Sequence, residues 1–243
     1  MTKPLVRAES PIWQSKAQLL SEVLGLGYAD AGSRNEAGLI LVVGERLHLE
    51  NKKGLTFEID FDEDHVHYQQ KQIGKKNLLA RALGIEKGIN QVVDLSCGLA
   101  RDAVLLAQLG FQVKAYERCA VLWSMLIEAQ KFSTRPEVQG IEFINDNSLD
   151  VISRLSQAER HNQSFYFDPM FPETKKEALP KKEMQIFREL VGLDLDSVEV
   201  VRRSFEMKIS RLVVKRPRKA KPLFRDPRYC LEGNLIRYDV YQF

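Results

Sequence analysis

The sequence has few cysteines, and they do not follow a metal-binding pattern. Only three occur in 243 residues, at Cys97, Cys119 and Cys230, without the short paired spacings of zinc sites or disulfide frameworks. We therefore expect reduced thiols in a cytoplasmic protein. The pair His65 and His67 lacks a further spaced ligand and favours a polar strand end over a metal site. No metal site is predicted.

Long apolar runs are also absent. No stretch approaches the roughly 18 residues that a membrane-spanning helix needs, and residues 1–10 contain no hydrophobic signal core. Hydrophobic residues make up 44% of the chain and charged residues 28%, which is ordinary for a globular protein. These absences predict a cytoplasmic location and no membrane partner.

The net charge of +3 is small, but it is unevenly distributed. Residues 211–228 contain eight basic side chains and one acid, so the rest of the chain carries a net negative charge. A concentrated basic segment suits a polyanion. Because Phe224 and Tyr229 accompany it, this segment is the best candidate in the chain for contact with RNA.

The sequence lacks the glycine-rich motif of dinucleotide sites. Residues 92–102 read V-V-D-L-S-C-G-L-A-R-D, which predicts a buried strand, a small-residue turn and a helix. Of the motif G-x-G-x-x-G only Gly98 is present, which disfavours a nicotinamide oxidoreductase. Asp94 would repel a pyrophosphate, whereas Asp94 and Asp102 suit a ligand with a cationic end, such as S-adenosylmethionine. A turn that binds nothing is the alternative.

Polar residues also end the next two predicted strands. Glu117 closes the strand at 112–117, 19 residues after Gly98, where an acid can accept hydrogen bonds from ribose hydroxyls. Asn147 and Ser148 follow the strand at 141–144. They could line an adenine site, or cap the next helix.

A further strand, 165–168, ends in Asp168-Pro169-Met170-Phe171-Pro172. This segment resembles the (Asp/Asn)-Pro-Pro-(Tyr/Phe) signature of methyltransferases that modify exocyclic amines of bases. The Asp168 carboxylate and the Pro169 carbonyl can accept the two N–H bonds of such an amine, and Phe171 can stack on the base. Taken alone, an ordinary Asp-Pro turn would explain the segment.

Together these motifs resemble the ribosomal small subunit methyltransferase J family, from about Gly74 to the C-terminus. The resemblance implies S-adenosylmethionine as cofactor and, as reaction, methylation of the exocyclic amine (N2) of a guanine in 16S rRNA, free or in the small ribosomal subunit. The likeness rests on Asp94-x-x-x-Gly98-Leu99-x-Arg101-Asp102, Glu117-Arg118, Asn147-Ser148 and Asp168–Pro172, and continues through 181–184, 190–196 and 213–217.

The first turn departs from the pattern of this family. It reads Asp-Leu-Ser-Cys-Gly-Leu-Ala, where Asp-Ala-Thr-Ala-Gly-Leu-Gly is usual, so Ala100 stands in place of a glycine. Asn147 stands where a serine is common, which preserves a hydrogen-bonding side chain.

The alternation of strands and helices predicts an α/β fold, a doubly wound Rossmann-like sheet at residues 71–243. Residues 1–70 are predicted to form a small α+β extension with a helix at 13–24 and strands at 38–43, 47–50 and 55–61. In the larger domain we expect strands at 91–95, 112–117, 141–144, 165–168, 211–215 and 235–241, and helices at 101–109, 120–131, 149–155 and 184–190.

The leading hypothesis is therefore an rRNA guanine-N2 methyltransferase. An amine methyltransferase that acts on DNA or protein, and a non-catalytic RNA-binding protein with this fold, are the alternatives. The predicted catalytic residues are Asp168, Pro169 and Phe171; the predicted cofactor-binding residues are Asp94, Gly98, Arg101, Asp102, Glu117, Arg118, Asn147, Ser148 and Asp168; the predicted RNA-binding residues are Lys175, Lys176, Lys181, Lys182, Lys215, Arg216, Arg218 and Lys219.

Overall fold

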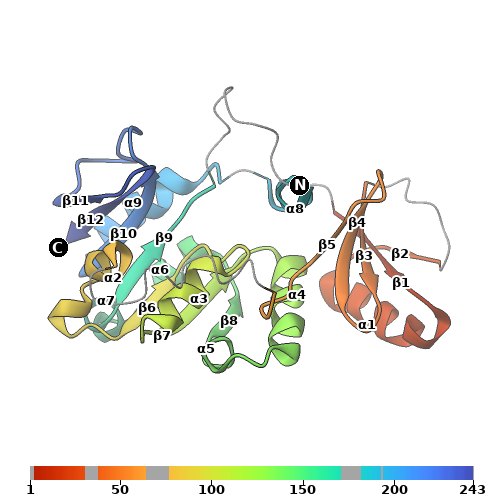
Figure 1. Ribbon diagram of the computed structural model, residues 1–243. Helices are drawn as coiled ribbons and strands as arrows, with labels where there is room; N and C mark the ends of the chain where they lie inside the picture. Colours follow the sequence, from red (N-terminus) through yellow and green to blue (C-terminus); the bar gives the residue numbers. More distant parts are fainter. Residues whose placement is uncertain (1–2, 31–37, 64–76, 171–181, 193, 243) are drawn as a thin grey trace. The chain divides into compact units, whose positions relative to one another are not determined.

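The computed structural model describes residues 3–30, 38–63, 77–170, 182–192 and 194–242 (Figure 1). The chain divides into two compact units, each assembled from several stretches. Unit 1 contains residues 1–60, 119–132 and 171–193, and unit 2 contains residues 61–118, 133–170 and 194–243. The predicted domain boundary at residue 70 lies outside the described residues and stays a prediction.

Unit 2 is built on a seven-stranded sheet with the order β11-β12-β10-β9-β6-β7-β8. The five strands from β10 to β8 are parallel, and β12 runs antiparallel to both β10 and β11. The strands are β6 (Gln91–Asp94), β7 (Gln112–Glu117), β8 (Glu142–Asn145), β9 (Ser164–Phe167), β10 (Arg211–Pro217), β11 (Tyr229–Glu232) and β12 (Ile236–Gln242).

The direction of winding reverses beside β6. The chain runs outward from β6 to β7 and β8, and then returns to form β9 on the other side of β6. Open α/β sheets bind ligands outside the carboxyl ends of their strands at such a switch point. The predicted doubly wound, Rossmann-like sheet is confirmed, and its switch point lies between Asp94 at the end of β6 and Asp168 just after β9.

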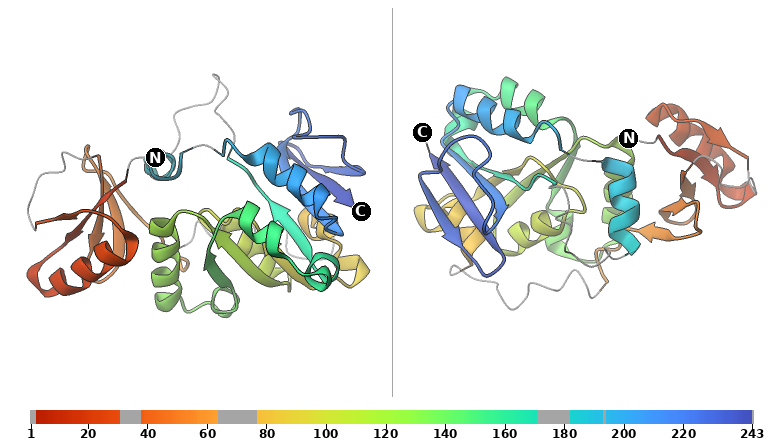
Figure 2. Two further views of the ribbon diagram at one scale, coloured as in Figure 1. Left: turned by 180° about the vertical axis from the view of Figure 1, so that it is seen from behind. Right: turned by 90° about the horizontal axis from the view of Figure 1, so that it is seen from above.

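Helices cover both faces of this sheet (Figure 2). On one face, Val93, Phe165 and Leu212 of the sheet form an apolar core with Ile152 of α6 and Val201 of α9. Each fully buried aliphatic side chain of this kind stabilises the fold by about 1.5–3 kcal/mol. The helices that contribute to this core are α6 (Ser148–Arg154) and α9 (Ser197–Glu206).

The opposite face is covered by α2 and α3. Successive residues of a strand point to opposite sides of a sheet, so Ser164 and Tyr166 face away from the Phe165 core. Ser164 Oγ donates to the carbonyl of Leu83 in α2, and the Tyr166 hydroxyl donates to Asp102 in α3. Besides α6 and α9, the helices of unit 2 are α2 (Leu78–Leu83), η3 (Ile85–Lys87), α3 (Arg101–Gln108), α5 (Pro136–Gln139) and α7 (Gln157–Asn162).

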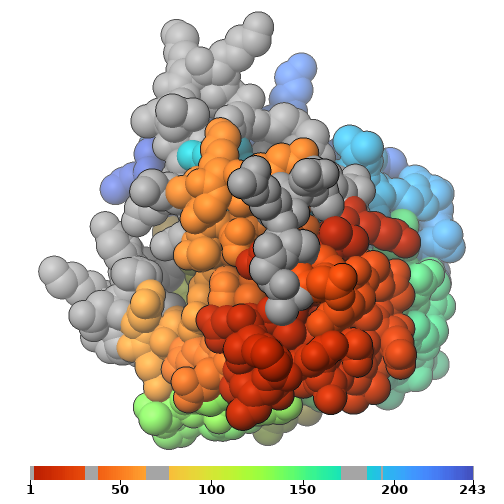
Figure 3. All heavy atoms as spheres, turned by 90° about the vertical axis from the view of Figure 1, so that its right-hand side faces the viewer, coloured from red at the N-terminus to blue at the C-terminus, as the bar shows by residue number. Residues whose placement is uncertain are grey.

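Unit 1 contains a five-stranded sheet with the order β2-β1-β3-β4-β5. Helices α4 and α8 pack against its strands β4 and β5 although their residues follow residue 70, and the Leu47 N–H donates to Glu128 of α4 at 2.8 Å. The residues nearest the N-terminus, red to orange, form a continuous surface in Figure 3. The elements are β1 (Leu5–Ala8), η1 (Pro11–Trp13), α1 (Gln14–Leu24), β2 (Tyr28–Ala29), β3 (Leu39–Val43), β4 (Leu47–Asn51), β5 (Thr56–Glu58), α4 (Ala120–Phe132) and α8 (Lys182–Val191).

Within the described ranges, no helix combines the length and the apolar character that crossing a membrane requires.

Candidate functional site

The turn after β6 is the first part of the candidate site. Asp94 is only 1% exposed, and its Oδ1 accepts the N–H of Ser96 at 2.9 Å. Burial raises the pKa of the Asp94 carboxyl to about 8, and the nearby carboxylates of Asp102, Asp168 and Glu117 add to the rise. Burial also raises the pKa of the Cys97 thiol, which keeps it protonated and supports its role as a small residue of the turn.

Ala100 adopts a left-handed backbone conformation, with φ 58° and ψ 16°, immediately before α3. A glycine adopts this conformation without strain, whereas an alanine loses roughly 1–2 kcal/mol. The turn after β6 therefore holds Ala100 in a strained backbone conformation. Asp102, in the first turn of α3, lies near the positive end of the helix dipole.

Glu117 lies at the end of β7 and is buried. Its Oε2 accepts the N–H of Gly98 at 2.9 Å, which places the carboxylate beside the β6 turn. Its backbone carbonyl accepts the Asn145 side-chain amide at 2.7 Å. The ends of β6, β7 and β8 are thereby joined, and the predicted ribose acid stands next to the predicted cofactor turn.

Asn147 and Ser148 have structural roles in the described chain. The Asn147 side chain caps α6 by accepting the Leu149 N–H at 2.8 Å. Ser148 Oγ donates to the Leu95 carbonyl at 2.6 Å, which ties the start of α6 to the β6 turn. The expected helix cap is confirmed for Asn147, and contact of either residue with a cofactor stays a prediction.

Arg118 follows Glu117 and binds two acids. Its guanidinium pairs with Asp194 and, at 3.0 Å, with Asp196. Asp194 also accepts the N–H of Met170 at 2.6 Å. Arg118 therefore holds the loop that carries Asp168 and Pro169, a role that its sequence position alone did not indicate. Its direct contact with a cofactor stays a prediction.

The central feature of the site is a hydrogen-bonded chain around Asp168. Lys215 Nζ donates to Oδ2 of Asp168 and to Oδ2 of Asp102, both at 2.8 Å. The Tyr166 hydroxyl donates to the same oxygen of Asp102 at 2.5 Å, and the Asp168 N–H donates to Ser96 Oγ at 2.7 Å. Burial raises the pKa of the Asp168 carboxyl to about 6, while Lys215 opposes the rise.

Two residues of the predicted RNA surface are in a different environment. Lys215 is directed at two carboxylates, and Arg216 is buried with its Nη2 donating to the Lys221 carbonyl. Both residues lie on β10, whose central position holds them against neighbouring elements. Contact of Lys215 and Arg216 with RNA therefore stays a prediction, which the bonds of both side chains to the protein itself disfavour. Arg218 and Lys219 are exposed, and Arg218 pairs with Glu232 at 3.1 Å.

The remaining predicted residues lie partly outside the described chain. Phe171, Lys175, Lys176 and Lys181 lie outside the described residues, and Lys182 begins α8 without a described side chain. Pro169 is buried directly after Asp168, and Arg101 begins α3.

Sequence reasoning missed Ser96, Tyr166 and Asp194 as members of the site. Tyr166 alternates with the core residues Phe165 and Phe167, a pattern that could have indicated its direction. Asp194 lies in the stretch 190–196 that carried the family likeness, but nothing in the sequence pairs it with Arg118.

The charges at this site suit a cationic cofactor. Asp102, Glu117 and Asp168 contribute three acidic groups and Lys215 contributes one ammonium, while the buried Asp94 carboxyl keeps its proton at neutral pH. Gly98 and Ala100, on either side of Leu99, add little side-chain bulk to the turn. The sulfonium and ammonium groups of S-adenosylmethionine match this excess of acid, so the residues present fit the cofactor.

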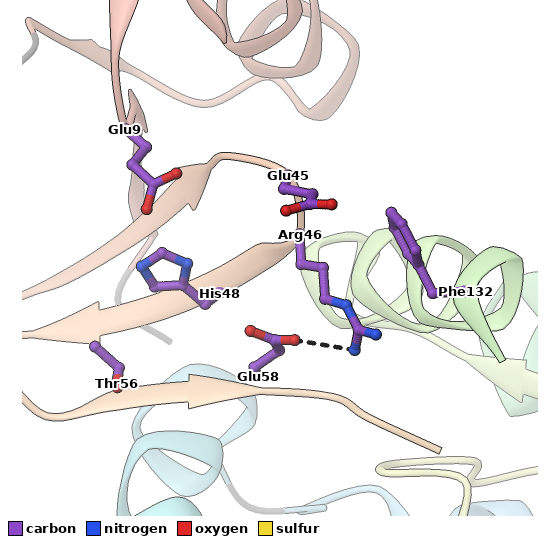
Figure 4. A pocket seen from close by; sticks show the side chains of 7 residues that line it. All are labelled: Glu9, Glu45, Arg46, His48, Thr56, Glu58 and Phe132. Atoms are coloured by element: carbon purple, nitrogen blue, oxygen red, sulfur yellow. Dashed lines mark hydrogen bonds and ion pairs between the residues drawn. The ribbon is translucent and has the colours of Figure 1, made fainter. Parts of the chain in front are cut away.

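A separate pocket of about 620 Å³ lies in unit 1. Figure 4 shows three glutamates, Arg46 and His48 around it, and Arg46 pairs with Glu58 at 3.2 Å and stacks on Phe132. It contains none of the predicted site residues. A search of the described residues finds no group of three or more His, Cys, Asp or Glu side chains that could hold a metal ion. The pocket is lined by Glu9, Glu45, Arg46, His48, Thr56, Glu58 and Phe132.

Comparisons with known proteins point to a methyltransferase family. The model of a SAM-dependent methyltransferase family matches residues 28–243. The ribosomal RNA small subunit methyltransferase J of Bdellovibrio bacteriovorus is 36% identical over 237 residues, which cover 97% of this chain and 94% of the relative. The protein of the same name from Dechloromonas aromatica is 37% identical over 242 residues, covering 95% and 96%.

Among solved structures, a SAM-dependent methyltransferase from Neisseria gonorrhoeae superposes with a TM-score of 0.73. It is 23% identical in sequence, and the match covers 98% of this chain and 95% of that one. This likeness shows a shared fold.

Proposed function

Because this chain belongs to the ribosomal RNA small subunit methyltransferase J family, we propose that its S-adenosylmethionine-dependent reaction methylates the exocyclic amine (N2) of a guanine in 16S rRNA. One observation carries the proposal: the Asp168-Pro169 pair follows β9 at the switch point of the sheet, where Lys215 joins Asp168 to Asp102. This position supports the proposal, because the predicted amine-binding residues then lie beside the turn predicted to bind the cofactor.

The cofactor residues have distinct roles in this proposal. S-adenosylmethionine supplies an electrophilic methyl group when it is bound. Glu117 would accept hydrogen bonds from its ribose, and Asp94 or Asp102 would face its methionine end. Arg101, Gly98, Asn147 and Ser148 would line the same site.

The acceptor residues prepare the amine. The lone pair of a base amine is delocalised into the ring, which makes it a poor nucleophile. Asp168 and the Pro169 carbonyl would accept its two N–H bonds and favour a localised lone pair, while Phe171 would stack on the base. With a pKa of about 6, the Asp168 carboxyl is mostly ionised at neutral pH. It can accept the amine proton as the new bond forms, or pass it to water.

The substrate must reach this site unpaired. A guanine in a helix cannot present its N2 edge to the site, so it has to lie in a loop or be flipped out. Phosphates beside it would contact the basic residues that remain candidates: Lys175, Lys176, Lys181, Lys182, Arg218 and Lys219. The proposed partner is 16S rRNA or the small ribosomal subunit, which places the enzyme in the cytoplasm.

The test is methyl transfer from labelled S-adenosylmethionine to small subunits that lack the modification. We expect labelled N2-methylguanine with the wild type. Asp168→Ala should lower the rate roughly 10²–10³-fold and keep cofactor binding, measured by calorimetry. Asp150→Ala is the matched control, because Asp150 is an exposed acid on α6 outside the site.

Each other outcome would reject a different part of the proposal. Cofactor binding without label on subunits would reject the rRNA substrate and move the search to DNA and protein amines. Binding of cofactor and RNA without any methylated product would support the non-catalytic alternative. An Asp168→Ala variant with the wild-type rate would remove Asp168 from the mechanism.

A further inference from the structure

Lys215 lies at the centre of the site, although it carries no role in the amine-binding motif. Its ammonium contacts Asp168 on one side and Asp102 on the other, both at 2.8 Å. Its side chain is 23% exposed. A lysine directed inward at two carboxylates is poorly placed to contact an RNA phosphate.

We propose that Lys215 is a positioning residue for methyl transfer, which holds Asp168 through Oδ2 so that Oδ1 is presented to the target amine. This inference rests on the proposed function, because it assigns Lys215 to the same acceptor site. Lys215 itself donates hydrogen bonds only and stays charged, so it does not take the proton of the amine.

The orientation of Asp168 is fixed from two directions. Lys215 holds its carboxylate, and the Asp168 N–H donates to Ser96 Oγ at 2.7 Å. Asp102 in turn anchors Lys215, and the Tyr166 hydroxyl fixes Asp102. The chain of contacts crosses α3, β9 and β10, which are rigid elements, so the carboxylate plane is defined before a substrate arrives.

Lys215 also sets the charge of the acceptor. Burial raises the pKa of Asp168 to about 6, and Lys215 opposes that rise. Although burial opposes it, Asp102 and Asp168 raise the pKa of Lys215 above its ordinary value. The other titratable groups around Asp168 carry negative charge or none: Asp102 of α3, Asp94 of β6, Asp194 before α9, Tyr166 of β9 and Tyr238 of β12.

Removal of the lysine charge should therefore protonate Asp168 at neutral pH. With Lys215→Met, the acid limb of the rate profile should move upward by roughly one to three pH units, which is the size of an ion-pair effect on a carboxyl pKa. A proton on Oδ1 or Oδ2 removes acceptor capacity, so the rate at pH 7 should fall about twofold for a rise of one unit in the pKa of Asp168 and about tenfold for a rise of two units. A lysine with a merely structural role would lower the rate equally at all pH values.

The experiment measures single-turnover methyl transfer to unmodified small subunits from pH 5.5 to 9, at saturating cofactor. Lys215→Met is compared with Lys215→Arg, which keeps the charge and should restore the wild-type acid limb. Lys219→Met is the matched control: Lys219 is an exposed cation four residues along the chain, so its loss should raise KM for the subunit and leave the acid limb in place. If Lys215→Met instead raised KM for the subunit and left the acid limb in place, the proposal would be overturned.

A second measurement does not depend on methyl transfer. Carboxyl carbon NMR of aspartate-labelled protein, with Asp168→Asn to identify the signal, gives the pKa of Asp168 directly. We expect a higher value in Lys215→Met than in the wild type, and an equal value would overturn the role of Lys215 whatever the enzyme methylates. Wild-type protein that titrates as expected but transfers no methyl group would reject the proposed function alone. Should Lys215→Met fail to fold in thermal melts, Lys215→Gln provides the neutral variant.

Discussion

The burial of Asp94 predicts that the free energy of unfolding depends strongly on pH, because a carboxyl that is 1% exposed keeps its proton at neutral pH. Burial, together with the neighbouring carboxylates, raises its pKa from 3.8 to about 8. In the unfolded chain it returns to its ordinary value. Between about pH 4 and pH 8 the unfolded state has lost this proton and the folded state has not, so stability falls as the pH rises.

The perturbation that isolates this effect is Asp94→Asn. The asparagine Oδ1 can still accept the Ser96 N–H, which Asp94 accepts at 2.9 Å, and its amide resembles the protonated acid. Each pH unit in the window costs the wild type about 1.4 kcal/mol relative to the variant. The free energy of unfolding of the variant, relative to that of the wild type, should therefore rise by roughly 3 kcal/mol from pH 5 to pH 7.

Urea unfolding at pH 5, 6, 7 and 8 measures this difference directly, since each curve gives a free energy of unfolding. Below pH 4 the two proteins should converge in their pH dependence, because the carboxyl is protonated in both states. Parallel stability curves for wild type and variant from pH 5 to pH 8 would refute the reasoning and show that Asp94 is ionised in the folded protein.

Two further changes test the turn and the loop of the site. Ala100→Gly should raise the free energy of unfolding by up to about 1 kcal/mol, since relief of the left-handed alanine exceeds the added chain entropy; a lower melting temperature would contradict this. Asp194→Asn weakens the bridge from Arg118 to Met170 and should lower the methyl-transfer rate about fivefold without changing cofactor affinity. Asp196→Asn is its control, because Asp196 binds Arg118 but not Met170, and equal losses in both variants would remove the special role of Asp194.

The sheet of unit 2 was predictable because its central strands β6, β9 and β10 are almost wholly buried, and β7 alternates buried and exposed residues before it ends in Glu117. The expected strand at 112–117 coincides with β7, and the expected helix at 101–109 differs from α3 by one residue. β11 was not predicted, since its alternating half-exposed residues follow a basic loop and gain order by pairing with β12. β1 and α7 were missed for a related reason: each is short, and tertiary contacts stabilise it.

The candidate site was predictable only where a residue lies at a strand end. Asp94, Glu117 and Asp168 follow directly from that rule. Lys215 does not, because a lysine inside a basic stretch resembles a solvated charge until β10 is placed beside β9. The pairing of Arg118 with Asp194 joins residues 76 positions apart, and no local pattern encodes it.

The bridge at Asp194 has a consequence for how this family could vary. Residues 171–193 leave unit 2 after Met170 and return at Asp194, and the Met170 N–H bonds to the Asp194 carboxylate. The residues that flank this segment, Met170 and Asp194, are thus joined whatever the sequence between them. Since doubling the length of a closed loop costs only about 0.6 kcal/mol, insertions and exchanges there should leave Asp168 in place. The length of this segment can therefore differ between relatives while the carboxylate of Asp168 keeps its position beside Lys215.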